Sequence, residues 1–199
     1  DPAQDVSDAR HAPSFADLAE RYLVEHAELK KRPKSVALDK SLLRLHVMPA
    51  LGAMKVEAIT RHEVSRLHHK MKNTPVVGNR ALSLISKIMN LAEKWGLRPD
   101  GTNPCRHVEK YPERRMERFL TDDELARLGS TLLTAERAQT ESPSVIAAIR
   151  LLILTGARVG EVLHLRWAEV DFERSFLRLD DSKTGAKVIH LGEAAVVVL

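Results

Sequence analysis

Helix-start signals recur along this 199-residue chain and constrain its fold more than any other feature of the sequence. At each signal a Ser or Thr N-cap, or a proline suited to a first turn, precedes apolar residues spaced three and four apart. The first four signals predict a bundle of four helices, of which the second ends before Pro49 and the fourth at Gly96. The last predicts a helix over 145–155 that is apolar nearly all round and therefore buried. The signals are Ser14, Pro33, Thr60, Pro75, Thr121 and Pro143.

The hydrophobic period changes toward the C-terminal end of the sequence. A polar stretch at 180–185 separates two short apolar runs, 176–179 and 188–191. Such a pattern is typical of a β-hairpin, and it places Lys183 at the turn. The sequence therefore predicts a fold that is mainly α with a small antiparallel β-sheet.

Prolines and glycines mark the expected domain boundary. Pro99, Gly101, Pro104 and Pro112 bar regular structure after the fourth helix, in a stretch that is also basic. We expect a leader at 1–13, a helical domain at 14–98, a basic linker at 99–117 and a mixed α/β domain at 118–199.

The positive charge of the chain is concentrated in its first half. Residues 11–98 carry 16 Lys and Arg against 8 Asp and Glu, a net charge of +8, whereas residues 99–199 carry 14 against 16. A basic segment of this size is a plausible electrostatic footprint for a nucleic-acid backbone. Basic surfaces also serve solubility or bind acidic proteins, so charge alone leaves these alternatives open.

The fourth predicted helix carries a polar stripe, Arg80, Ser83, Lys87, Asn90 and Lys94, at intervals of three and four. From Arg80 to Lys94 the stripe is ~21 Å long, enough for several side chains to follow a DNA groove. A solvated face of an ordinary surface helix is the alternative interpretation. The start of the second helix is basic as well. The residues that we expect to bind DNA are Lys31, Arg32, Lys34, Arg80, Lys87, Asn90 and Lys94.

Composition and motif spacing exclude several other classes of protein. The longest apolar run, 145–154, contains Arg150 and is far shorter than the ~20 residues of a membrane span. The single cysteine, Cys105, cannot form an internal disulfide, which fits a reducing cytoplasm, and we expect it to be structural. His62 and Glu63 begin a zinc-protease pattern, but Arg66 stands where the second ligand should be. We therefore expect no membrane association, no metal, no cofactor and no small-molecule substrate.

Four short motifs follow one another in the second half of the chain. They are Gly-Ala-Arg-x-Gly-Glu at 156–161, Leu-x-Trp at 165–167, Val-Asp at 170–171 and Ser-Lys-Thr-Gly at 182–185. Each is weak alone, but the spaced combination resembles the catalytic domain of the tyrosine recombinases of phage-integrase type. The resemblance implies a helical core-binding domain at 14–98 and a truncated α/β catalytic domain, its first half, at 118–199.

The resemblance assigns roles to three residues. Arg158 matches the family arginine that binds the scissile phosphate, Glu161 the acidic residue that supports it, and Lys183 the lysine that protonates the departing 5′ oxygen. The chemistry agrees, because a guanidinium offers a planar fork of donors to the charge that develops on a phosphodiester, and a hairpin lysine can donate a proton. A purely structural Arg158–Glu161 ion pair and an ordinary turn lysine are the alternatives.

Other parts of the family site have no match in this chain. Its two tyrosines, Tyr22 and Tyr111, do not match the family nucleophile, and the His-x-x-Arg motif would lie beyond Leu199. We expect a fragment of a longer integrase, inactive by itself, whose parent performs site-specific recombination on double-stranded DNA with other integrase protomers in the bacterial cytoplasm. One alternative is a non-catalytic DNA-binding regulator derived from an integrase. Another is a helical interaction module whose basic face binds acidic proteins.

Overall fold

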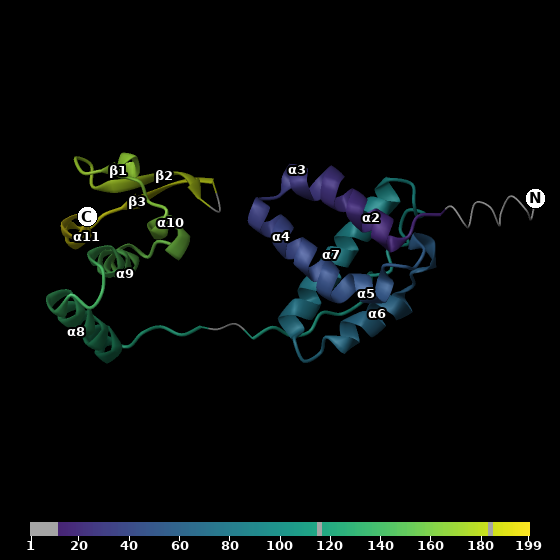
Figure 1. The fold of residues 1–199 in the computed structure, drawn as a ribbon, viewed down its shortest axis with the longest axis horizontal. Coiled ribbons are helices and arrows are strands. Elements are labelled where there is room, and N and C mark those ends of the chain that lie inside the picture. The colour runs from purple at the N-terminus through teal and green to yellow at the C-terminus, as the bar shows by residue number, and fades with distance from the viewer. Residues whose placement is uncertain (1–11, 115–116, 183–184) are drawn as a thin grey trace, which may run out of the picture. The chain divides into compact units, whose positions relative to one another are not determined.

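The computed structural model describes residues 12–114, 117–182 and 185–199. The chain divides into two compact units between residues 116 and 117. The fold is mainly helical with one small antiparallel sheet, which confirms the predicted fold class (Figure 1). Within the described ranges, no helix combines the length and the apolar character that crossing a membrane requires.

The first unit is built from long helical segments. Two of them contain a π-helical turn in the middle, so each is one continuous rod in Figure 1. The first rod is α2 (Phe15–Tyr22), η1 (Leu23–Ala27) and α3 (Glu28–Lys30), and the second is α4 (Pro33–Leu42), η2 (Leu43–Val47) and α5 (Met48–Leu51). After a 3₁₀ turn, η3 (Val56–Ala58), come α6 (Arg61–Lys70) and α7 (Pro75–Lys94).

The predicted caps are confirmed, whereas the predicted end of the second helix is wrong. Ser14 and Asp17 form a reciprocal capping box, as do Thr60 and Glu63. The second rod continues through Pro49 to Leu51. The preceding turn is π-helical, with the amide of Met48 bonded to the carbonyl of Leu43, so the chain has already left the i to i−4 pattern that a proline interrupts.

The core of the first unit lies around α7. This helix packs against α2, α6 and η2, and its apolar side is closed from solvent. Since one side is buried in this way, the polar stripe from Arg80 to Lys94 remains on the opposite, exposed side. The largest fully buried side chains of this core include Phe15, Leu18, Tyr22, Leu51, Ile85, Ile88 and Met89.

Residues 99–114, which the sequence assigns to a linker, pack against the helices of the first unit. The Asn79 side chain makes two hydrogen bonds to the backbone of Tyr111. Its Nδ2 donates to the Tyr111 carbonyl (2.8 Å), and its Oδ1 accepts from the Tyr111 N–H (2.9 Å). Cys105 is buried in the same core. Prolines and glycines prevent regular backbone hydrogen bonding, but side chains of α7 replace it here.

The second unit combines four helices with the sheet. Thr121 and Ser142 cap α8 and α9, as predicted. The strands are antiparallel in the order β1-β2-β3, and β2 and β3 form the predicted hairpin. The elements are α8 (Asp122–Ala138), α9 (Pro143–Thr155), α10 (Val159–Leu163), the 3₁₀ turn η4 (Trp167–Glu169), β1 (Val170–Asp171), β2 (Phe176–Ser182), β3 (Gly185–His190) and α11 (Glu193–Val198).

The core of the second unit is small. Leu177, Leu179 and Ile189 of the hairpin pack with Leu151 of α9 and Val162 of α10. The prediction that the 145–155 helix is buried nearly all round is wrong. Only two of its residues are buried, and Ile153 and Leu154 are 46% and 45% exposed. The helix is apolar nearly all round, as the sequence shows, but no described element covers the outer side of α9.

Candidate phosphate site and nucleic-acid interface

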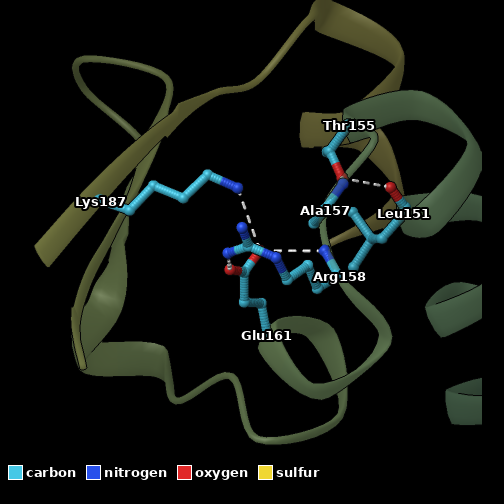
Figure 2. Close-up of polar contacts among 6 residues, drawn as sticks. All are labelled: Leu151, Thr155, Ala157, Arg158, Glu161 and Lys187. Carbon is cyan, nitrogen blue, oxygen red and sulfur yellow. Dashed lines mark hydrogen bonds and ion pairs between the residues drawn. The ribbon is translucent and has the colours of Figure 1, made fainter. Parts of the chain in front are cut away.

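A tight turn between α9 and α10 positions Arg158. Gly156 ends α9 in the left-handed conformation (φ 62°), which glycine adopts without a steric penalty. The Thr155 hydroxyl then holds the turn from both sides. It donates to the carbonyl of Leu151 (2.5 Å) and accepts from the amide of Ala157 (3.2 Å), as Figure 2 shows. Arg158 therefore stands at the N-cap position of α10.

Glu161 orients Arg158 through two hydrogen bonds. One carboxylate oxygen accepts from the Arg158 amide (2.9 Å) and the other from a guanidinium nitrogen, Nη1 (2.7 Å) (Figure 2). The Glu161 side chain is only 7% exposed, whereas that of Arg158 is 47% exposed. The carboxylate thus fixes one edge of the guanidinium, and the other donors remain accessible to an anion.

Lys187, on β3, is a third member of this site and belongs to none of the sequence motifs. Its Nζ lies 3.1 Å from the same oxygen that binds the Arg158 amide (Figure 2). The signal was present in the alternation of the strand, because Lys187 shares a face with Ile189, which is buried. A lysine on the core face of a strand needs a partner, and Glu161 supplies it.

The site holds Glu161 in its charged form. Hydrogen bonds from the Arg158 amide, then from Lys187 and the Arg158 guanidinium, lower the pKa of Glu161 to about 2. At neutral pH it is therefore a carboxylate that orients cations and cannot donate a proton. Lys183, the predicted proton donor, lies outside the described residues.

The predicted DNA-binding stripe of α7 faces outward. Arg80, Lys87, Asn90 and Lys94 are all exposed. Asn90 is partly engaged, because its Oδ1 accepts a hydrogen bond from Asn103 (2.6 Å). The lysine and arginine side chains of the stripe thus remain available to a ligand.

The stripe borders a groove of about 740 Å³ in the first unit. One wall comes from the start of the second rod, another from α7, and Lys110 of the 99–114 segment contributes as well. The polar residues along it include Lys31, Ser35, Asp39, Arg80, Ser83, Lys87, Lys110 and Glu113. The sequence did not predict Lys110, because its segment was expected to be a separate linker.

Lysines from two segments act on His26. The pKa of His26 is lowered first by burial and then by the positive charges of Lys87, Lys30, Lys31 and Lys94. The first and last of these belong to α7, and the other two lie at or directly after the end of the first rod. Both groups of lysines therefore disfavour the protonated form of this imidazole.

The three residues predicted to bind DNA at 31–34 differ in their surroundings. Lys31 donates to the carboxylate of Asp39 (2.6 Å), so a DNA phosphate would compete with that carboxylate for it. Arg32 also has an interaction within the chain. Lys34 is exposed at the start of α4.

Both tyrosines are engaged in the first unit. Tyr22 is fully buried and donates to Asp39 (2.6 Å), and burial followed by this hydrogen bond raises its pKa. Tyr111 stacks on His68 and donates to its carbonyl (3.2 Å). Neither hydroxyl is free to act as a nucleophile in this structure. Within the described residues, no three His, Cys, Asp or Glu side chains are grouped as metal ligands.

Two family models match the chain. Residues 118–199 match the phage integrase family, and residues 14–72 match the phage integrase N-terminal SAM-like domain. Both models are of the family that the sequence motifs indicated.

Curated relatives are integrases. The prophage integrase IntF of Escherichia coli (strain K12) is 27% identical over 187 residues, which cover 86% of this chain and 38% of that protein. The ICEBs1 integrase of Bacillus subtilis (strain 168) is 24% identical over 175 residues, covering 86% of this chain and 45% of that protein. The chain therefore spans less than half of the length of these two relatives.

Solved structures share the fold. A lambda integrase tetramer bound to a Holliday junction matches with a TM-score of 0.77 at 19% identity, covering 98% of this chain and 56% of that chain. The Tn1549 transposon integrase in complex with circular intermediate DNA matches with a TM-score of 0.72 at 15% identity, covering 94% and 63%. At these identities the likeness concerns the fold of the two units.

Proposed function

The chain belongs to the phage integrase family of tyrosine recombinases, and from this membership we propose that it is the DNA-binding and phosphate-binding part of a site-specific recombinase. The first unit would bind duplex DNA, and Arg158 of the second unit would bind the scissile phosphate. The lambda and Tn1549 relatives are described in complexes with DNA, the former as a tetramer, and we extend to this chain both DNA and other protomers as partners.

The observation that carries the proposal is the half-exposed Arg158 guanidinium on a buried carboxylate. The cations of Arg158 and Lys187 share the single negative charge of Glu161, which leaves a net charge of +1. One phosphodiester would neutralise it. Because Glu161 already fixes the guanidinium, binding the phosphate would require little reorganisation as charge grows in the transition state.

The groove beside α7 supports duplex binding by the first unit. Its cations come from three segments that the fold brings together, and the unit is strongly basic as a whole. Contacts of lysine and arginine with phosphates position DNA without reading its sequence. Asn90 and Arg80 are the side chains of the stripe suited to base edges.

The proposed reaction follows the chemistry of the family. A tyrosine attacks the phosphate, a 3′-phosphotyrosyl link forms, and the 5′ oxygen leaves with a proton from Lys183. We propose that the 199-residue chain does not catalyse this step alone. The engagement of Tyr22 with Asp39 and of Tyr111 with His68 supports this part of the proposal, since both hydroxyls already donate hydrogen bonds within the first unit.

The test compares two arginines with the same local geometry. Arg158 and Arg166 each bind the glutamate three residues later through backbone and side chain, but only Arg158 matches the family motif. In the complete protein encoded by the gene, Arg158→Ala should slow covalent capture of a nicked duplex by about 100- to 1000-fold. Arg166→Ala should leave it within a few fold.

Duplex binding, measured in parallel, should change little in either variant. Normal covalent capture by Arg158→Ala would contradict the proposed function. A covalent band formed by the 199-residue chain itself would contradict its predicted inactivity.

A further inference from the structure

A buried carboxylate links the β2–β3 hairpin to the Arg158 turn. Glu161 of α10 binds Arg158 three residues earlier and Lys187 twenty-six residues later. The two cations approach different oxygens of the side chain, with Lys187 on the oxygen that also accepts from the Arg158 amide. A displacement of Lys187 therefore acts directly on the group that orients the guanidinium.

Lys187 lies close to the end of the hairpin that the paired residues Ser182 and Gly185 form. It is two residues after Gly185, which corresponds to about 7 Å of strand. The ladder shifts register between Leu179, the partner of Lys187, and Ser182, the partner of Gly185. The hydrophobic contacts of Leu177 and Ile189 hold the base of the hairpin. Next to the register shift, the Lys187–Glu161 ion pair connects β3 to α10, which pairing between the two strands cannot do.

We propose that Lys187 is a positioning residue that sets the distance between the Arg158 guanidinium and the Ser182 and Gly185 end of the β2–β3 hairpin. It does so through Glu161 and without contacting DNA. The inference rests on the proposed function, because Lys183, which matches the family lysine, follows Ser182 directly in the sequence. A proton donor carried on a hairpin has to meet the oxygen that leaves the phosphate held by Arg158, so both need a common reference point.

Cleavage kinetics on a nicked duplex test the proposal in the complete protein. Lys187→Met should slow single-turnover cleavage by about 10-fold or more, since an error of ~1 Å in placement can cost up to about 100-fold. Lys187→Arg, which can still bind Glu161, should restore most of the rate. Arg178→Met is the matched control, because Arg178 is an exposed cation of the same hairpin that stacks over Phe176. It should cleave normally.

The Glu161→Gln background distinguishes positioning from direct contact. If Lys187 acts through Glu161, adding Lys187→Met to Glu161→Gln should cost less than about 2-fold further, because the pair is already broken. An equal loss in both backgrounds would overturn the proposal. Loss of duplex affinity in Lys187→Met parallel to the loss of cleavage would also overturn it, by making Lys187 a DNA contact.

A measurement on the 199-residue chain tests the geometry apart from function. Amide hydrogen exchange near Ser182 and Gly185 should accelerate in Lys187→Met and stay unchanged in Arg178→Met. Unchanged exchange in Lys187→Met would overturn the proposal. Normal cleavage by Lys187→Met beside inactive Arg158→Ala would overturn it and leave the proposed function standing. Normal cleavage by Arg158→Ala would contradict the proposed function, while hydrogen exchange would still report on the link.

Discussion

The two units of the chain differ in how completely they bury their apolar side chains. Among the described residues, five large hydrophobic side chains are exposed in the first unit and thirteen in the second, although the second is shorter. The first unit closes its core around α7, whereas the second leaves one side of α9, with Ile153 and Leu154, in contact with solvent. The apolar core is therefore closed more completely in the unit that we propose to bind DNA.

The difference places the residues of the phosphate site in the less completely packed unit. Arg158, Glu161 and Lys187 are held together by hydrogen bonds and charge, on elements that share a small core. The groove of the first unit instead carries exposed cations, Arg80 and Lys87, on a well-packed helix. Binding strength and chemistry should thus respond to different substitutions.

Truncation of one isoleucine in each unit should give the largest difference in stability change between the two units. Ile88 is fully buried in α7, and Ile88→Ala should destabilise the first unit by about 2–5 kcal/mol through lost burial and a cavity. Ile153→Ala, at a 46% exposed position, should cost the second unit less than about 1 kcal/mol. Each unit contains one tryptophan, Trp95 or Trp167, so single-tryptophan variants can follow urea unfolding of each separately.

One shared transition reported by both tryptophans would contradict the expected difference between the units. Destabilisation of both reporters by Ile88→Ala would mean that the units unfold together. A large effect of Ile153→Ala would mean that the outer side of α9 is covered in solution.

Removal of charge from the groove should affect binding, with smaller effects on folding. Replacing Arg80, Lys87 and Lys94 with alanine should weaken duplex binding by the 199-residue chain. It should also reduce the slope of log affinity against log salt by about three, one for each lost phosphate contact. A matched triple variant of exposed second-unit cations, Arg127, Arg137 and Arg174, should change the slope much less. Equal slopes in the two triple variants would show that DNA is not bound at the groove.

Local signals in the sequence predicted much of the fold. The capping boxes at Ser14, Thr60 and Thr121 depend on residues within one turn, so the sequence contains all the information that they need. The continuation of the second rod through Pro49 could not be predicted, because a π-helical turn has no strong local signature. The packing of 99–114 was also missed, since it depends on Asn79, more than thirty residues away in the chain.

The candidate site likewise contains residues that the sequence predicts and residues that only packing brings in. Arg158 and Glu161 belong to one short motif and are brought together by a single helical turn, so their pairing follows from spacing. Lys187 joins them only when the hairpin packs on α10, which no pattern of fixed spacing records. Lys110 likewise reaches the groove through tertiary packing. Sequence motifs thus predict the chemical groups, and packing determines which groups meet.

Acid should affect the second unit through Glu161, with the smallest of the three effects. Its pKa falls from the ordinary value of 4.5 to about 2 in the folded chain, so the folded state favours the carboxylate. The resulting stabilisation is fully present above about pH 4.5 and is lost as the pH falls toward 2.

Unfolding followed by Trp167 at pH 7 and pH 3 should show less acid sensitivity in Glu161→Gln, which is already less stable at pH 7. Glu169→Gln is the matched control, because Glu169 caps η4 with Arg166 in the same way and its pKa is lowered less strongly. A larger reduction of acid sensitivity in Glu169→Gln than in Glu161→Gln would show that the three-residue Glu161 site does not dominate the electrostatics of this unit.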